Sequence, residues 1–132
     1  MSSFHIARDL AVVALGGAIG SVARYSVGMA VAAAIPSAFP WGILIVNVVG
    51  CLTIGMLGEW FTLTKLAPEW WRLLLVTGFL GGLTTFSSFG YDTYRQLSIA
   101  EYGAALANIA ANVTLGLAAV WIGVIIVRQF HY

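Results

Sequence analysis

Charged side chains are rare in this chain, and long apolar stretches separate them. The 132 residues include 6 Lys or Arg and 5 Asp or Glu, the hydrophobic share is 61%, and the mean hydropathy is +0.95. A charge at the centre of a bilayer costs about 3 kcal/mol, whereas about 20 consecutive apolar residues cross it freely. A soluble chain of this length needs far more polar surface. The sequence therefore predicts an all-α membrane protein and excludes a soluble enzyme.

The uncharged stretch from Tyr25 up to Glu59 is too long for one crossing, and Pro36 and Pro40 divide it. Proline cannot continue a helix, so these two residues predict a short loop between two spans. We expect one transmembrane domain over residues 1–132 with four helices, at about 9–34, 41–63, 70–94 and 100–127. Four crossings place both termini on the same side of the membrane.

The basic residues leave the orientation in the membrane open. Four of them lie on the side of the predicted termini and two lie towards the other side: Arg8, Lys65, Arg72 and Arg128 against Arg24 and Arg95. The excess of positive charge favours cytoplasmic termini. A bias this small also fits a chain that inserts in both orientations.

The charge content excludes a nucleic-acid-binding protein, and the cysteine content excludes disulfide and cysteine–zinc sites. The net charge is +1 and no run of Lys or Arg is present, so the chain has no surface for a nucleic-acid backbone. Cys51 is the single cysteine, which rules out an internal disulfide and a zinc site built on cysteines.

The segment from Gly78 to Phe89 departs most from an ordinary membrane helix. Its glycines fall within five residues and four hydroxyl residues follow them, in the order GFLGGLTTFSSF. Glycine relaxes the backbone and hydroxyl groups can satisfy freed backbone groups, so we expect the third helix to be broken near its middle. Freed carbonyl oxygens there would suit a hard cation such as sodium. A packing face made of small residues is the alternative interpretation.

Phe86 and Phe89 follow this segment and lie on one helix face, at positions i and i+3. Two such rings commonly face lipid or pack against a neighbouring helix. Their edges carry partial positive charge, however, and could favour a small anion in a narrow path.

Polar side chains inside the other predicted spans indicate where the helices face protein or water. These residues are Arg24 in the first helix, Asn47 in the second, and Asn108 and Asn112 in the fourth, with Thr114 nearby. Hydrogen bonds between helices and a polar path for an ion are both open interpretations of the asparagines. Gly16 and Gly20 form a GxxxG face that allows close approach of another helix.

With these residues in view, the chain resembles the Fluc-type fluoride channels of microbes. The resemblance covers essentially the whole length and is carried by GGAIGSVARY at 16–25, NVVG at 47–50 and the specific signature GFLGGLTTFS at 78–87. It implies an antiparallel homodimer of dual topology in the cell (inner) membrane, with passive fluoride export, fluoride resistance and a structural sodium ion at the dimer interface.

The resemblance also implies roles for individual residues. Asn47 would contact fluoride, Phe86 and Phe89 would form an aromatic box across subunits, Arg24 would sit at a vestibule, and the backbone carbonyls of Gly81 and Thr84 would bind sodium. The polar track of the fourth helix would fall on Asn108 and Asn112. The chain departs from the family there, and at Ile43 and Asp92, where Thr and Glu are common.

Two rival functions remain at this stage. A small dual-topology multidrug or cation exporter needs a carboxylate deep in the membrane for proton exchange, and this chain has none in the middle of a predicted span. A non-transporting scaffold subunit would explain the small-residue faces, but not the grouping of Asn, Phe and a broken helix. A membrane enzyme is disfavoured, because no nucleophile has a base at a suitable spacing.

Overall fold

The computed structural model describes residues 3–64 and 67–131, and all of its regular elements over these ranges are helices. They are α1 Ser3–Ala34, α2 Trp41–Thr64, α3 Glu69–Arg72, the π-helical segment η1 Leu73–Leu80, α4 Gly81–Leu83, α5 Phe86–Ser98 and α6 Tyr102–Gln129. The segments α3, η1, α4 and α5 together make one span, so four helices are long and apolar enough to cross a bilayer. The all-α membrane fold is confirmed, and the chain is a multi-pass membrane protein.

Helix ends differ most from the expected limits where those limits were placed at charges. The first helix begins at Ser3 instead of near Asp9, and the third span continues to Ser98 instead of ending near residue 94. Charges mark the edge of the hydrocarbon, but a helix does not have to end at that edge. Arg8 and Asp9 lie within α1 and form an ion pair at 2.8 Å. Lys65 lies outside the described residues.

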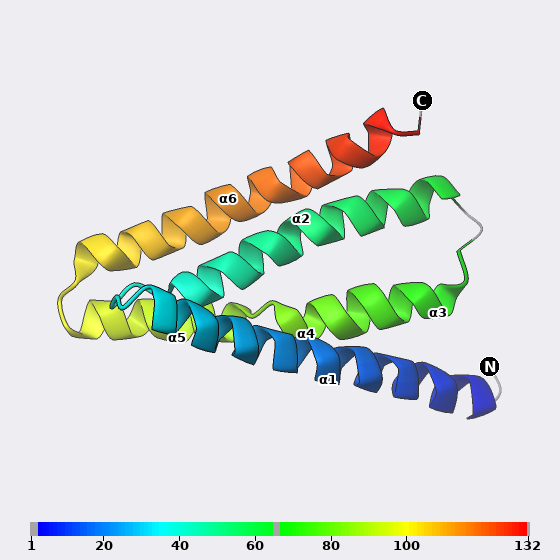
Figure 1. Ribbon diagram of the computed structural model, residues 1–132, viewed down its shortest axis with the longest axis horizontal. Helices are drawn as coiled ribbons and strands as arrows, with labels where there is room; N and C mark the ends of the chain where they lie inside the picture. Colours follow the sequence, from blue (N-terminus) through cyan, green and yellow to red (C-terminus); the bar gives the residue numbers. More distant parts are fainter. Residues whose placement is uncertain (1–2, 65–66, 132) are drawn as a thin grey trace.

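The four spans run roughly side by side, with both termini at one end of the bundle (Figure 1). α2 packs mainly against α6, and α1 packs mainly against η1 and α4. Contacts between these two pairs are fewer, and α5 extends from the second pair to pack on α6. This arrangement leaves a cleft between the pairs at mid-length.

Glycines allow the backbones of α1 and the third span to touch. A Cβ atom at Gly20 would overlap the carbonyl oxygen of Phe79, and one at Gly16 would overlap that of Leu74. On the other side, a Cβ at Gly78 would lie 2.9 Å from the oxygen of Val13. The predicted close approach at the GxxxG face is therefore confirmed, and its partner is η1 with α4.

Most large apolar side chains point outwards. Leu10, Val22, Leu106, Leu117 and Trp121 are each more than 60% exposed in the single chain. The main buried cluster is small and consists of Val46, Leu80 and Leu83. Lipid replaces water as the surrounding solvent, so the outer apolar surface is compatible with stability and the interior needs close backbone packing instead.

We predict that Gly20→Ala lowers the stability of the purified protein in detergent by about 2 to 3 kcal/mol, because the new methyl group overlaps backbone that cannot move aside. Thermal unfolding followed by circular dichroism measures the effect. Gly28→Ala on the same helix is the matched control, since nothing lies within 4 Å of a Cβ there. Equal melting temperatures for the two variants would contradict the packing account.

Candidate functional site

The third span loses its helical backbone at two threonines. α4 ends at Leu83, Thr84 has φ −84 and ψ 155, and Thr85 has φ −153 and ψ 119, so both residues are extended before α5 begins at Phe86. The sequence argument assigned the irregular backbone to glycine. Gly81, however, is helical with φ −62 and ψ −34. Gly78 and Gly82 serve close packing against α1, and the threonines carry the interruption.

Each threonine stabilises one helix end next to the interruption. Thr84 donates from its backbone nitrogen and from its hydroxyl to the carbonyl oxygen of Leu80, at 3.0 and 2.9 Å. The Thr85 hydroxyl oxygen accepts a hydrogen bond from the backbone nitrogen of Ser88 at 3.1 Å and so forms the N-cap of α5. The Thr85 hydroxyl thus satisfies a backbone nitrogen that the lost helical turn would leave unpaired, while the Thr84 hydroxyl adds a second bond to a carbonyl that its own backbone nitrogen already engages.

Asn47 on α2 pairs with the extended backbone itself. The backbone nitrogen of Thr85 donates to Asn47 Oδ1 at 2.9 Å, and Asn47 Nδ2 donates to the Thr85 carbonyl oxygen at 3.2 Å. A carboxamide carries an acceptor oxygen and an NH₂ donor in one plane, so it can pair with the N–H and C=O of a backbone residue as a neighbouring peptide strand would. An apolar side chain could make neither bond.

A hydrogen-bonded network extends from Asn47 along α6 to α5. Asn47 Nδ2 donates to Asn112 Oδ1 at 3.0 Å, and Asn112 Nδ2 donates to Asn108 Oδ1 at 2.9 Å. Asn108 Nδ2 then donates to the hydroxyl of Thr93 at 2.9 Å, and that hydroxyl donates to the Phe89 carbonyl oxygen at 2.8 Å. We call Asn47, Asn112, Asn108 and Thr93 the polar network.

A cleft of about 400 Å³ opens beside the interruption, between α2 and α6 on one side and η1 and α4 on the other. Asn47, Gly81, Thr84, Phe86, Phe89 and Asn112 all line it. The rest of the lining is mainly apolar and includes Ile54 and Val113. Few polar groups in an apolar cleft are typical of a selective binding site.

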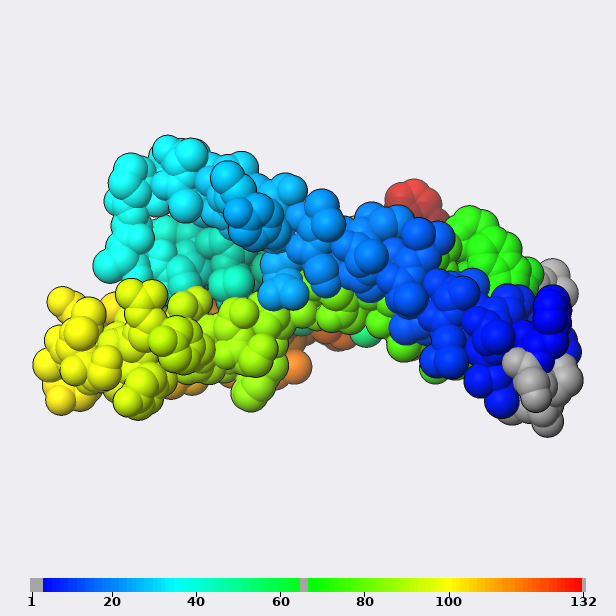
Figure 2. All heavy atoms as spheres, turned by 90° about the horizontal axis from the view of Figure 1, so that it is seen from below, coloured from blue at the N-terminus to red at the C-terminus, as the bar shows by residue number. Residues whose placement is uncertain are grey.

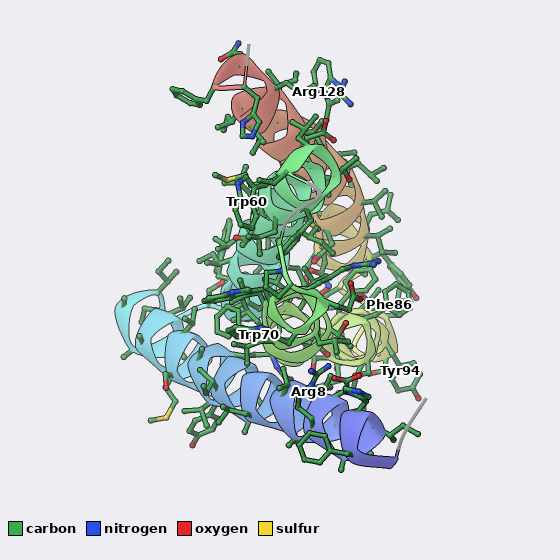
Figure 3. The ribbon with its side chains drawn as sticks, turned by 90° about the vertical axis from the view of Figure 1, so that its right-hand side faces the viewer. Arg8, Trp60, Trp70, Phe86, Tyr94 and Arg128 are labelled. Carbon is green, nitrogen blue, oxygen red and sulfur yellow. The ribbon has the colours of Figure 1, made fainter. Side chains whose placement is uncertain are left out.

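The two phenylalanines differ in burial although they share a helix face. Phe86 is 83% exposed and Phe89 is 9% exposed, and their ring centroids lie 5.3 Å apart at an interplanar angle of 55°. Figure 3 shows Phe86 and Tyr94 on the same outer side of the bundle. One ring therefore closes the cleft from inside, while the other projects from its rim.

Six of the eight site residues expected from the sequence line this one cleft, and the other two do not. Asn108 is fully buried behind Asn112. Arg24 lines a separate cavity of about 370 Å³, and its Nε donates to the Gly82 carbonyl oxygen at 3.0 Å. This bond satisfies a carbonyl at the end of α4 and holds α1 against the interruption.

Sequence reasoning missed Thr85 and Thr93 as members of the site. The signal for Thr93 is its position four residues after Phe89, on the face of α5 that meets the asparagines of α6. Thr114 was expected to extend the polar track, but it is exposed and donates to the carbonyl oxygen of Ala110 in its own helix at 2.6 Å. It does not belong to the polar network.

Within residues 3–64 and 67–131, no group of three or more His, Cys, Asp or Glu side chains is placed to hold a metal ion. A cation at this site would take backbone, carboxamide and hydroxyl oxygens as its ligands. Gly81 belongs to the last turn before the interruption, where carbonyl groups lack the usual helical donor, and Thr84 is extended. Both face the cleft, so the residues present fit an oxygen-seeking cation.

Comparison with known proteins identifies the family of this chain. The model of the family described as CrcB-like protein, Camphor Resistance (CrcB), matches residues 11–124. A relative from Rhizobium etli is 52% identical over 119 residues, which cover 88% of this chain and 93% of the relative. One from Solibacter usitatus is 47% identical over 118 residues, covering 89% and 96%. Both relatives carry the name "Fluoride-specific ion channel FluC". This chain therefore belongs to the CrcB family.

Proposed function

We propose that this protein is a fluoride-selective channel, which lets fluoride leave the cell passively across the cell membrane and so gives resistance to fluoride. Its relatives are named as fluoride-specific ion channels, which supports fluoride as the transported ion. The observation that carries the proposal for this chain is the pairing of Asn47 with Thr85 beside an apolar cleft. This pairing places the amide donors of Asn47 near the middle of the span. An anion that has lost its hydration shell there needs hydrogen-bond donors from the protein in place of water.

The donors of the polar network are engaged by neutral acceptors. Asn47 Nδ2 donates to the Thr85 carbonyl and to Asn112 Oδ1. A hydrogen bond to an anion is charge-assisted and roughly twice as strong as one between neutral groups. Fluoride can therefore take the place of Asn112 Oδ1 and be passed along by exchange of partners.

The aromatic rings act on selectivity. The edge of a phenylalanine ring carries partial positive charge, and Phe86 and Phe89 both line the cleft. Rings presented edge-on attract a small anion and keep the path too narrow for a larger one. Because Phe86 projects from the rim, it can reach a pathway shared with a second copy of the chain.

The exposed ring and the open-sided cleft support an antiparallel homodimer with dual topology. One chain offers two backbone oxygens, from Gly81 and Thr84, which is fewer than hard cations take. A second copy related by a twofold axis would double that number, so we place a structural sodium ion between the two interruptions. The weak charge bias of the sequence is consistent with insertion in both orientations.

An exporter driven by proton exchange fits the cleft less well. No Asp, Glu or His is among the described residues that line it, whereas such an exporter needs a carboxylate deep in the membrane. The relatives are named as ion channels, and a channel that binds and releases an ion unchanged is not an enzyme.

Liposomes loaded with fluoride or with chloride test the proposal. The purified protein should release fluoride rapidly and passively, and should not release chloride, as followed with ion-selective electrodes. Phe86→Ile should slow fluoride release by about tenfold or more, the loss of about 1.4 kcal/mol of barrier lowering. Phe130→Ile is the matched control, because that ring is equally exposed, at 84%, but lies beyond α6. No fluoride release from folded wild-type protein, or equal chloride release, would refute the channel.

Sodium is tested by exchanging it for N-methylglucamine, a cation too large for carbonyl oxygens to surround. Protein dialysed against this cation should lose dimer on size-exclusion chromatography and lose fluoride flux after reconstitution. Returning sodium should restore both. A dimer with full flux in sodium-free solution would contradict the sodium site and leave the fluoride pathway itself unaffected.

A further inference from the structure

Gln96 on α5 is the buried polar side chain that the polar network does not account for. It is 6% exposed, and neither its Oε1 nor its Nε2 has a hydrogen-bond partner among the described residues. Its backbone carbonyl is engaged by the nitrogen of Glu101 at 2.9 Å, so the helix end is satisfied. Burying an amide without hydrogen bonds costs about 1–3 kcal/mol of stability. A bound ligand that hydrogen-bonds to the Gln96 side chain would remove this cost.

The helix places Gln96 between two polar regions. Thr93, the last member of the polar network, lies three residues earlier on the buried face of α5. Asp92 lies four residues earlier, and with Arg95 it lines a cavity of about 280 Å³ together with the C-terminal part of α1, the loop that follows it and the first residues of α2. Gln96 lies next to this cavity in the sequence of α5 but is not one of the residues that line it. Residues at spacings of three and four are neighbours on a helix surface.

The cavity opens at the loop end of the bundle. Figure 2 shows the C-terminal part of α1 and the body of α5 separated there, with atoms of α2 between them. Arg95 is exposed at this end of α5 and supplies positive charge, which offsets the carboxyl group of Asp92 in the same cavity. Hydrogen-bonded polar groups thus extend from Asn47 at mid-span, through Asn112 and Asn108, to Thr93. Gln96 follows Thr93 by three residues on the buried face of α5, towards the end of the bundle where the cavity lies.

We propose that Gln96 is a further anion-binding residue, which receives fluoride between the polar network and this cavity. Its Nε2 donates to the ion, as a neutral amide donor that binds an anion without holding it as a full positive charge would. The inference rests on the proposed fluoride channel and adds a site near the membrane surface.

Three variants test this site in the liposome assay. Gln96→Leu removes the donor at similar volume and should slow fluoride release by about tenfold, the equivalent of one lost hydrogen bond. Its melting temperature should not fall, because no bond within the described chain is broken. Gln96→Met gives the same comparison if leucine leads to aggregation. Thr53→Val, which removes an exposed hydroxyl bonded to Val49 of its own helix, is the matched control and should keep wild-type flux.

Gln96→Glu separates ion binding from a structural role. Its carboxylate should repel fluoride and reduce flux below that of Gln96→Leu at neutral pH, with recovery as acid protonates the carboxyl group. The pH profile of the wild type, measured alongside, corrects for any titration of Asp92, Arg95 and Glu101. Protein-free liposomes correct for hydrogen fluoride that leaks through the lipid. Wild-type flux in Gln96→Leu, or flux in Gln96→Glu that follows the wild-type profile, would overturn the role of Gln96. Absence of flux in the wild type would instead overturn the channel.

Discussion

Backbone groups in hydrocarbon must be hydrogen-bonded within the protein, and the extended residues Thr84 and Thr85 are where this chain meets that constraint. Asn47 pairs with both polar groups of Thr85, and the threonine hydroxyls satisfy the adjacent helix ends. Without a side-chain amide at this height, the interruption would carry unpaired groups that each cost several kcal/mol. The cleft lies beside this interruption, and in the channel that we propose the amide that stabilises the interruption is also the donor for the ion.

Close packing on the opposite side fixes the position of the interruption. Gly16 and Gly20 let α1 touch the backbone of η1 and α4, and Arg24 bonds to the carbonyl of Gly82. The first half of the third span is thereby held by α1, while α5 is held by α6 through Asn108 and Thr93. Two halves supported by different neighbours can keep their ends offset, which a continuous helix could not do.

The sequence was sufficient for the membrane class, the four spans and the GxxxG contact, because charge spacing and small-residue patterns act locally. Four residues of the cleft stood out as polar or aromatic side chains within the spans, whereas Gly81 and Thr84 were named through the family resemblance alone. It could not show which residues carry the interruption, since glycine permits irregular backbone but also permits close helix contact, and only the neighbouring α1 decides between them. A structural and a functional role of Arg24 were both open from the sequence, because its bond to Gly82 depends on a partner 58 residues away. Gln96 has no motif, and its burial without a partner is visible only in the fold.

The central claim is that Asn47 and Asn112 act on fluoride as one network, and a double-mutant cycle measures this directly. Fluoride efflux is compared for wild type, Asn47→Leu, Asn112→Leu and the double variant, each shown to be folded. Residues that act as a unit have non-additive effects, so the double variant should be no slower than Asn47→Leu alone. Independent losses that multiply in the double variant would contradict the network as the path of the ion.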